Sequence, residues 1–212
     1  MQDHWTIGRD GSTVLTMLGT PKRDRQTERR EATRQEILTA AWATARVQGL
    51  AQITLREVAD RVGMRAPSLY SHFASKNAIY DAMFGQAWGE FLESALAADT
   101  PAPRTARSAL RRYARLFFDF AVADLARHQL MNQRTIPGFV PSEESYAPAV
   151  AVIGLLRERM ASYGISRDQD ADLFTAIVGG LVNQQLANDP GGDRYARLLD
   201  RAIDMYADNL GL

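Results

Sequence analysis

The chain has 212 residues, no cysteine, and 25 basic and 25 acidic side chains. This length suits one large domain, or one small and one larger domain, and 46% hydrophobic residues are enough for a core. The composition excludes a disulfide framework, a thiol nucleophile and a zinc–thiolate site, and no apolar run approaches the roughly twenty residues of a membrane span.

The charges are distributed unevenly along the chain. Residues 22–76 contain eleven Lys or Arg against six Asp or Glu, whereas residues 1–21 have a net charge of −1 and residues 77–212 a net charge of −4. A basic N-terminal third on a mildly acidic body is typical of a protein that presents one end to a polyanion such as nucleic acid.

Residues 1–26 are predicted to form a disordered extension that ends in a basic arm. Glycines interrupt any periodicity there, and the acidic residues do not suit a secretion signal. An alternative is that the native protein starts at Met17. The basic run, residues 22–34, leads into a helix; such arms contact phosphates or enter the minor groove, although a charged run can equally be a solvated surface.

Residues 27–76 are predicted to form a compact head of three helices. Thr33 and Glu36 have the spacing of a capping box, which predicts the start of a long helix that ends at Gly49. Thr54 repeats this spacing with the glutamate three residues later. It therefore predicts the start of a short helix that a glycine at position 63 ends.

The next helix is predicted to begin at Ala66, with Pro67 in its first turn. Together the two short helices predict a helix-turn-helix, whose second helix enters the major groove of DNA. Arg65 is the best candidate for a base edge, because Arg binds guanine O6 and N7, and the serines are permissive. The alternative is an ordinary helix pair with a solvated polar face. The predicted DNA-binding set is Arg29, Arg30, Thr54, Arg65, Ala66, Pro67, Ser68, Tyr70, Ser71, His72 and Lys76.

Residues 77–212 are predicted to form a larger helical domain. Apolar residues at helical spacing predict helices over 77–98, 104–123, 125–133, 143–163 and 167–188, and a last helix from residue 193. Helix caps are predicted at Ser75, Asp124 and Ser142, and a capping box at Ser166 and Gln169. No strand pattern is present, so the predicted fold is all-α, with about nine helices.

Glycine is found twice in succession within the predicted helix 167–188, at Gly179 and Gly180. Each glycine inside a helix costs about 1 kcal/mol relative to alanine. We therefore expect this pair to admit the close approach of another helix.

The stretch from Thr33 to Trp88 resembles the DNA-binding head of a TetR/AcrR-family transcriptional regulator. The resemblance rests on Val58-Ala59-x-x-Val62-Gly63-Met64 and, above all, on the Leu-Tyr-x-His-Phe-x-x-Lys string of residues 69–76. It implies that Tyr70, His72 and Lys76 contact phosphates and that the start of the recognition helix reads bases. Pro67 departs from the small or polar residue often found there.

The resemblance also implies what the protein does. A member of this family is most often a repressor that binds a palindromic operator as a dimer and is released by a small effector. The aromatic residues of the middle helices favour an apolar or aromatic effector. The alternative is a helical interaction module that binds protein partners and no DNA.

The middle helices would enclose the effector, and the last two helices would pair with their counterparts across a two-fold axis. In both cases the alternative is that the same side chains pack in the chain's own core, and His128 is expected at the surface or as a cap. The predicted effector-binding set is Trp88, Phe91, Tyr113, Phe117, Phe120, Met131, Phe139, Asn183 and Gln184. The predicted dimer set is Phe174, Ile177, Gly180, Leu181, Leu198, Ala202, Ile203 and Tyr206.

No catalytic arrangement is found in the sequence. The three histidines, His4, His72 and His128, are not spaced as metal ligands, and phosphate-binding glycine loops and nucleophile elbows are absent. We expect no enzymatic activity, no cofactor, no membrane partner and a cytoplasmic location.

Overall fold

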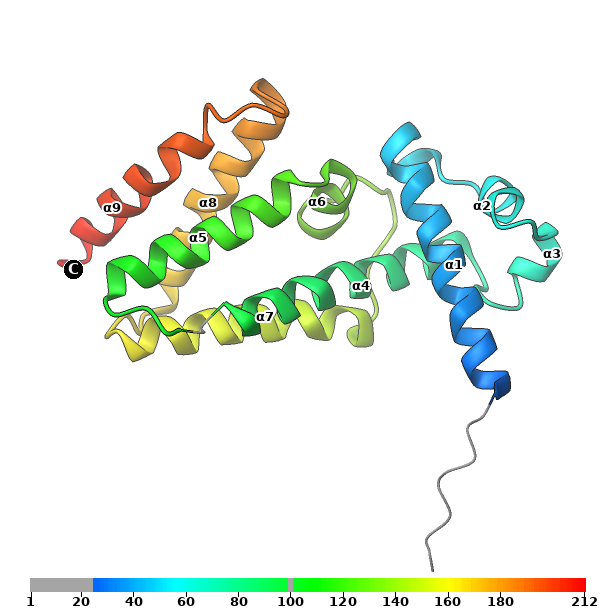
Figure 1. Cartoon of the computed structure of the whole chain (residues 1–212), viewed down its shortest axis with the longest axis horizontal. Coiled ribbons are helices and arrows are strands. Elements are labelled where there is room, and N and C mark those ends of the chain that lie inside the picture. The colour runs from blue at the N-terminus through cyan, green and yellow to red at the C-terminus, as the bar shows by residue number, and fades with distance from the viewer. Residues whose placement is uncertain (1–24, 99–100) are drawn as a thin grey trace, which may run out of the picture.

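The computed structural model describes residues 25–98 and 101–212, and over these residues the fold is all-helical, with nine α-helices, two short 3-10 turns and no strand (Figure 1). The predicted fold class and number of helices are confirmed. The predicted N-terminal extension lies outside the described residues as far as residue 24. The elements are α1 (Arg25–Gln48), η1 (Leu50–Gln52), α2 (Leu55–Arg61), α3 (Ala66–Leu69), α4 (Lys76–Ala97), α5 (Ala106–Val122), α6 (Leu125–Asn132), α7 (Glu143–Ser162), α8 (Asp168–Asn188), η2 (Ala196–Leu198) and α9 (Leu199–Asn209).

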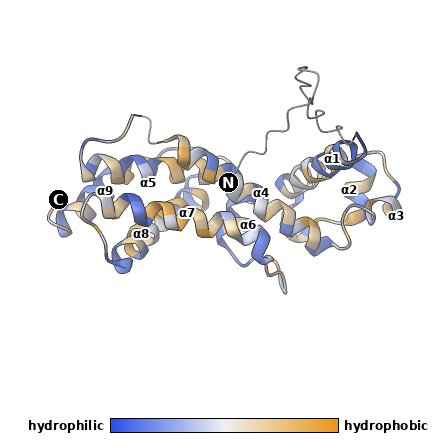
Figure 2. Ribbon diagram, turned by 90° about the horizontal axis from the view of Figure 1, so that it is seen from below, coloured by the Kyte–Doolittle hydropathy of each residue, from blue (hydrophilic) through white to orange (hydrophobic). Residues whose placement is uncertain are grey.

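The helices form a small head, α1 to α3, and a larger body, α5 to α9, which lie at opposite ends of the molecule (Figures 1 and 2). Helix α4 runs from the head into the body, and α7 lies along it. The C-terminus is at the end of the body that is far from the head (Figure 1). None of the described helices is long and apolar enough to cross a membrane.

Several helices begin where short polar side chains were predicted to cap them. The side chains of Ser75, Asp124 and Ser142 accept hydrogen bonds from backbone N–H groups three residues on, at 3.1, 3.1 and 3.2 Å. Each contact satisfies one of the N–H groups that a helix start leaves without an intrahelical partner. These three predicted caps are confirmed.

Two predicted capping boxes are wrong. Helix α1 begins at Arg25, so Thr33 lies inside it and its hydroxyl donates to the Arg29 carbonyl oxygen at 3.0 Å. Helix α8 begins after Arg167 and has no side-chain cap, so Ser166 lies before the helix start. In both cases the motif is present in the sequence, but the helix starts elsewhere.

The box at Thr54 is half formed. The Thr54 hydroxyl accepts the hydrogen bond from the Glu57 N–H at 3.2 Å, as predicted. The Glu57 carboxylate does not return the bond; it accepts one from Gln48 at 2.7 Å and pairs with Arg61 at 3.6 Å. Glu57 therefore ties α2 to the end of α1.

The first turns of α4 are attached to the head. Tyr80 is fully buried, and its hydroxyl donates to the Leu50 carbonyl oxygen at 2.6 Å. Burial raises the pKa of Tyr80 to about 12, so the phenol keeps its proton at neutral pH. Lys76 donates to the Ala51 carbonyl oxygen at 2.8 Å. Because both contacts are to η1, the head and the start of α4 form one unit.

Helix α7 is held on α4 by one carboxylate near the head. Asp81 accepts hydrogen bonds from the Ser142 N–H and hydroxyl, at 2.7 and 2.8 Å, and from the Ser145 hydroxyl at 2.9 Å. One turn further along α4, a side chain at Gly85 would come within 3.3 Å of the Ser145 Cα. The two helices therefore approach each other closely where α7 begins.

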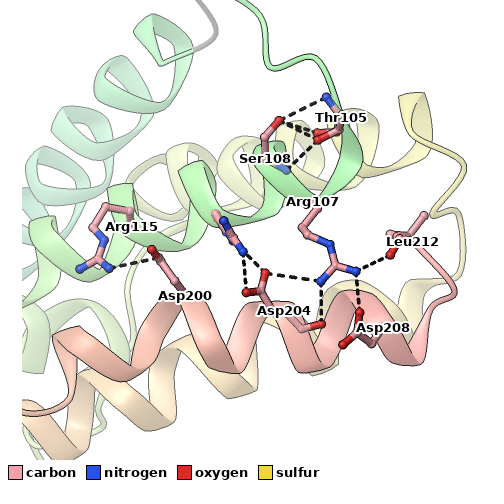
Figure 3. A network of polar contacts seen from close by, with 9 residues as sticks. Thr105, Arg107, Ser108, Arg115, Asp200, Asp204, Asp208 and Leu212 are labelled. Atoms are coloured by element: carbon pink, nitrogen blue, oxygen red, sulfur yellow. Dashed lines mark hydrogen bonds and ion pairs between the residues drawn. The ribbon is translucent and has the colours of Figure 1, made fainter.

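In the body, three arginines of α5 pair with three aspartates of α9, and Figure 3 shows the two helices side by side. Each set recurs every four residues, which places its members on one face of its helix. The pairs include Arg111 with Asp204, at 2.8 Å from Nε to Oδ1, and Arg115 with Asp200, at 3.2 Å. Arg107 and Asp208 form the third pair, and we call these three Arg–Asp pairs the ladder.

Candidate functional site

The head exposes a polar surface around α3. Leu69 and Phe73 are buried and hold this short helix against α1 and α2. On the outer side, Arg65, Pro67, Ser68, Tyr70 and Ser71 are exposed, and Tyr70 has 53% of its surface accessible. Ala66 and His72 are half-buried. The structure thus brings most of the predicted DNA-binding residues to one surface.

The predicted basic arm is helical where the structure describes it. Arg29 and Arg30 lie in the first turns of α1, and both are exposed. The Arg30 guanidinium donates to the Ser71 carbonyl oxygen at 3.3 Å, and the Arg34 guanidinium donates to the His72 carbonyl oxygen. These contacts join the N-terminal part of α1 to the end of α3. The basic residues therefore help to position the helix that was predicted to enter the groove.

Thr54 and Lys76 have structural contacts as well as a place at this surface. The Thr54 hydroxyl caps α2. The Lys76 ammonium is bonded to the Ala51 carbonyl oxygen and lies 5.4 Å from the centre of the Tyr80 ring. Burial lowers the pKa of Lys76. In this structure the Lys76 ammonium is directed onto the head's own backbone, and its predicted contact with a phosphate stays a prediction.

The body contains a cavity of about 540 Å³ between α4, α5, α6, α7 and α8. A volume of this size is ordinary for a small-molecule site. Its wall is mostly apolar and contains no acidic side chain. The lining residues are Trp88, Phe91, Ala95, Tyr113, Leu116, Phe117, His128, Asn132, Val152, Ile153, Leu155, Leu156, Arg159, Phe174, Thr175, Ala176, Val178, Gly179, Gly180 and Asn183.

Five of the predicted effector-binding residues line this cavity, namely Trp88, Phe91, Tyr113, Phe117 and Asn183. The other four do not, and each has a different place in the structure. Phe139 and Met131 belong to the core that joins the head to α4 and α6, where Phe139 packs 5.7 Å from the Tyr80 ring.

Phe120 lies under the Arg127 guanidinium, 3.6 Å from ring centre to Cζ, and packs on Phe91. Gln184 is exposed and bonded to Asn188 one turn further along α8. An aromatic stripe at helical spacing cannot separate the side chains that face a cavity from those that fill the core beside it.

A polar cluster forms one part of the cavity wall. His128 is 2% exposed, contrary to the expected surface position, and its Nε2 lies 3.0 Å from the Asn183 Oδ1. Asn132 Nδ2 lies 3.3 Å from His128 Nδ1, and Gln133 Nε2 donates to the Asn183 Oδ1 at 3.1 Å. Burial lowers the pKa of His128, and the hydrogen bond to Asn183 opposes this shift in part. His128 is therefore neutral at pH 7, with its proton on Nε2.

Sequence reasoning missed His128, Asn132 and the cavity-facing residues of α7. Among these, Arg159 places its guanidinium 5.3 Å from the centre of the Tyr113 ring. The only available signal was the spacing of His128 and Asn132, which puts both on one face of α6. It does not say what that face meets.

The Gly179–Gly180 pair lines the cavity, and the expected close approach of another helix is not made by any described helix of the same chain. A side chain added at either glycine would find no atom within 4 Å. The pair instead leaves the α8 side of the cavity without side chains, which widens the space.

The predicted dimer residues separate into three groups by their exposure. Phe174, Ile203 and Tyr206 are buried in the chain's own core, at 4%, 0% and 3% exposure, so they cannot form a surface for a partner. Leu198 and Gly180 are exposed. The remaining members, Ile177, Leu181 and Ala202, are half-buried. The outer faces of α8 and α9 also expose Leu173 and Met205.

Comparisons with known proteins agree with this arrangement of head and body. Residues 37–83 match the family model for bacterial regulatory proteins of the tetR family. No curated protein matches the chain in sequence.

In the described part of the chain, no group of His, Asp and Glu side chains could hold a metal ion.

Several solved structures share the fold. A TetR-family transcription regulator from Marinobacter aquaeolei VT8 has 16% identity and a TM-score of 0.63 over 86% of this chain and 97% of that chain. A TetR-family transcriptional regulator from Bordetella parapertussis 12822 has 18% identity and a TM-score of 0.62 over 86% and 98%. The regulator FadR from Bacillus subtilis, in complex with stearoyl-CoA, has 16% identity and a TM-score of 0.66 over 81% and 96%.

At these identities the structures show a shared fold, and the family model supplies the match to the head. The polar surface around α3 lies within the matched head, and the cavity lies in the body. The head of the chain is therefore similar to that of the bacterial regulatory proteins of the tetR family, and the described chain shares its overall fold with solved structures of TetR-family regulators.

Proposed function

We propose that this protein is a repressor that binds a palindromic operator as a dimer and releases it when a small apolar or aromatic molecule enters the body cavity. The observation that carries the proposal is the course of α4. Its first turns are bonded to the head through Tyr80, and its later turns line the cavity through Trp88 and Phe91. One helix therefore reaches both the DNA-binding head and the effector site.

In the proposed complex, α3 lies in the major groove. Arg65 and Ser68 stand on its exposed side near its start, where base edges are reached, and Tyr70 stands near its end, where phosphates are reached. The bonds from Arg30 and Arg34 to the end of α3 fix the position of this helix and keep positive charge beside the phosphates.

The proposed dimer forms through the outer faces of α8 and α9. Leu173, Leu198 and Met205 are exposed to 46%, 42% and 64%, although all three are large and apolar. Pairing them with a second copy would remove this area from water and hold two heads apart at a fixed distance. Two heads bind a palindrome far more tightly than one, because a single helix-turn-helix buries little area.

Release follows if the effector favours a different position of α4. A ligand shifts an equilibrium only by as much as it binds one state better than the other. The cavity wall is shared by α4 and α7, and Asp81 holds the start of α7 beside the head. A molecule that separates these helices would move the head through the contacts of Tyr80. The structure of FadR with stearoyl-CoA supports a small-molecule effector for this fold.

The test is a selection of genomic fragments with the purified protein, followed by binding to the recovered operator at increasing salt concentrations. A regulator should recover a palindrome. The logarithm of its affinity should fall linearly with the logarithm of the salt concentration, because phosphate contacts release counterions. Arg65→Ala should relax the preference at one base position in each half-site, by about 1–3 kcal/mol of discrimination.

Arg104→Ala is the matched control, since Arg104 is exposed in the body, in the segment before α5, and lies outside the proposed DNA-binding and dimer surfaces. It should leave both affinity and selectivity unchanged. If no fragment is enriched, and binding to DNA has no salt dependence, the alternative of a helical interaction module without DNA binding would replace this proposal.

A further inference from the structure

The described chain encloses the body cavity only in part, because the cavity is partly open to solvent. Its inner wall is buried and includes Phe91, Tyr113 and Phe174. The lining residues of α4, α5 and α7 are all buried or half-buried. The exposed lining residues all belong to α8 or to the end of α6, namely Asn132, Thr175, Ala176, Gly180 and Asn183. The mouth of the cavity therefore lies along α8, beside the end of α6.

The α8 part of this mouth is not covered by any described residue. A side chain built at Gly179 or at Gly180 would meet no atom within 4 Å. A molecule in the cavity of a single chain would therefore keep part of its surface in water at this side. Small-molecule sites usually bury most of the surface of their ligand. The cavity of one chain is thus an incomplete site.

The mouth is continuous with the exposed apolar face of α8. Leu173, Ala176 and Gly180 are spaced by three and four residues, which places them on one face of the helix. All three are exposed, and Ala176 and Gly180 also line the cavity. Leu173 belongs to the face that is proposed to pair with a second copy. A helix seated on Leu173 would therefore lie over the mouth, and the missing side chain at Gly180 leaves room for its close approach.

We propose that the second copy of the chain covers this mouth, so that the effector site is complete only in the dimer. Leu173, Ala176 and Gly180 carry no charge, so two identical faces can pair here without repulsion between like charges. A molecule that contacts both copies would tighten the dimer, and the dimer would tighten its binding by the same factor. The inference rests on the proposed function in one respect, that the protein is a dimer through α8 and α9.

The first test uses the absence of cysteine from the chain. Ala176→Cys places one thiol at the mouth, and fluorescein maleimide measures how fast this thiol reacts. Leu198→Glu combined with Met205→Glu should dissociate the dimer, because both positions are exposed on the proposed dimer face and neither lines the cavity. The thiol should react at least about tenfold more slowly in the dimer than in the dissociated variant, because a covered site reacts only when the contact opens.

Two variants control this comparison, and sedimentation gives the mass of each protein. Ala32→Cys should react at the same rate in dimer and monomer, since Ala32 is exposed on α1 in the head. Val47→Glu adds a charge at an exposed apolar position of the head and should keep both the dimer and the slow reaction at Ala176→Cys. Dilution of the Ala176→Cys protein repeats the comparison without added charges.

The outcomes separate this inference from the proposed dimer. If Ala176→Cys reacts as fast in the dimer as in the dissociated variant, the inference is overturned and the proposed dimer stands. A monomeric mass of the unmodified chain at every concentration would overturn both.

The second test measures ligand binding with Nile red, a neutral apolar dye that fluoresces in apolar surroundings. The dimer should bind the dye at least about tenfold more tightly than the variant with Leu198→Glu and Met205→Glu, because the open mouth leaves part of the dye in water. Equal affinity would mean that the cavity of one chain is sufficient, and it would overturn the inference. A dimer that leaves the dye unbound would overturn it as well.

Discussion

The two sides of α5 show how the body combines a filled helix contact with an open one. On one side, Ala114 and Phe118 are buried against the core that α9 shares, and the ladder lies at the edge of this contact. On the other side, Tyr113 and Phe117 border the cavity, and the facing stretch of α8 is Gly179–Gly180. We call these the filled side and the open side of α5.

The difference follows from side-chain size and pairing. On the filled side, alanines allow the helices to approach, and each arginine has an aspartate opposite it. On the open side, long side chains hold the neighbouring helices away, and the two glycines contribute no side chain to fill the gap. A filled contact resists change because close-packed side chains lose contacts when they shift. The open side therefore has room for a ligand, whereas the filled side holds α5 and α9 in fixed positions.

The largest expected effect comes from cutting into the filled side. Ile203 is fully buried on α9, and Ile203→Ala would leave a void in a packed core, so we expect a loss of about 2–5 kcal/mol in the free energy of unfolding. Val47→Ala removes two methyl groups at an exposed position of α1 and should change stability by less than about 0.5 kcal/mol. Urea denaturation measures both. A small loss in Ile203→Ala would show that the filled side is not closely packed.

Most of the helices could be predicted from the sequence, because local signals determine where a helix starts and ends. The helix-turn-helix follows from Thr54, the glycine at position 63, which has a φ of 68°, and Pro67, each of which acts within its own turn. The caps at Ser75 and Asp124 were found for the same reason. Helical spacing also identified the elements of the body.

The capping signal failed where it competes with a longer helix. Thr33 can cap only if the chain before it is not helical, and residues from Arg25 continue the helix instead. The cavity could be predicted only in part, because its shape depends on how five helices meet. Nothing local to Gln184 or Asn183 says that the second faces the cavity and the first does not.

The second largest loss of stability is predicted for a substitution at the contact between α4 and α7. Asp81→Ala leaves the Ser142 and Ser145 hydroxyls and the Ser142 N–H without their acceptor, and we expect a loss of about 1–3 kcal/mol. Hydrogen exchange should increase first at residues 142–146. Asp119→Ala, an exposed position on α5, is the control. Unchanged exchange at the start of α7 would mean that Asp81 does not hold it.

Adding a side chain on the open side should raise the stability of the fold rather than lower it. Gly179→Ala adds a methyl group that meets no atom within 4 Å, and alanine favours the helix over glycine by about 1 kcal/mol. We expect a gain in stability of up to that amount. Gly85→Ala should gain less or lose stability, because the new Cβ would lie 3.3 Å from the Ser145 Cα. Thermal unfolding of the two variants compares the helix contacts directly, and equal gains would show that the α4–α7 contact is as open as the cavity.

The smallest effect is expected at the ladder, where the groups are solvent-exposed and screened. The hydrogen bond from Arg111 and its charge hold the pKa of Asp204 below its ordinary value of 3.8. A carboxylate with a lowered pKa in the folded state stabilises the fold above its ordinary pKa, and this contribution is lost as the pH falls through the lowered value.

Asp204→Asn cannot titrate, so its stability should lie below that of the unmodified chain at pH 7 and approach it as the pH falls to about 3. Added salt at pH 7 should narrow the same difference, because it screens the Arg–Asp attraction. Asp119→Asn is the control, because Asp119 is exposed on α5 and is not part of the ladder. A difference that stays constant with pH would mean that the Asp204 charge contributes nothing, and that side-chain packing alone holds the filled side of α5 together.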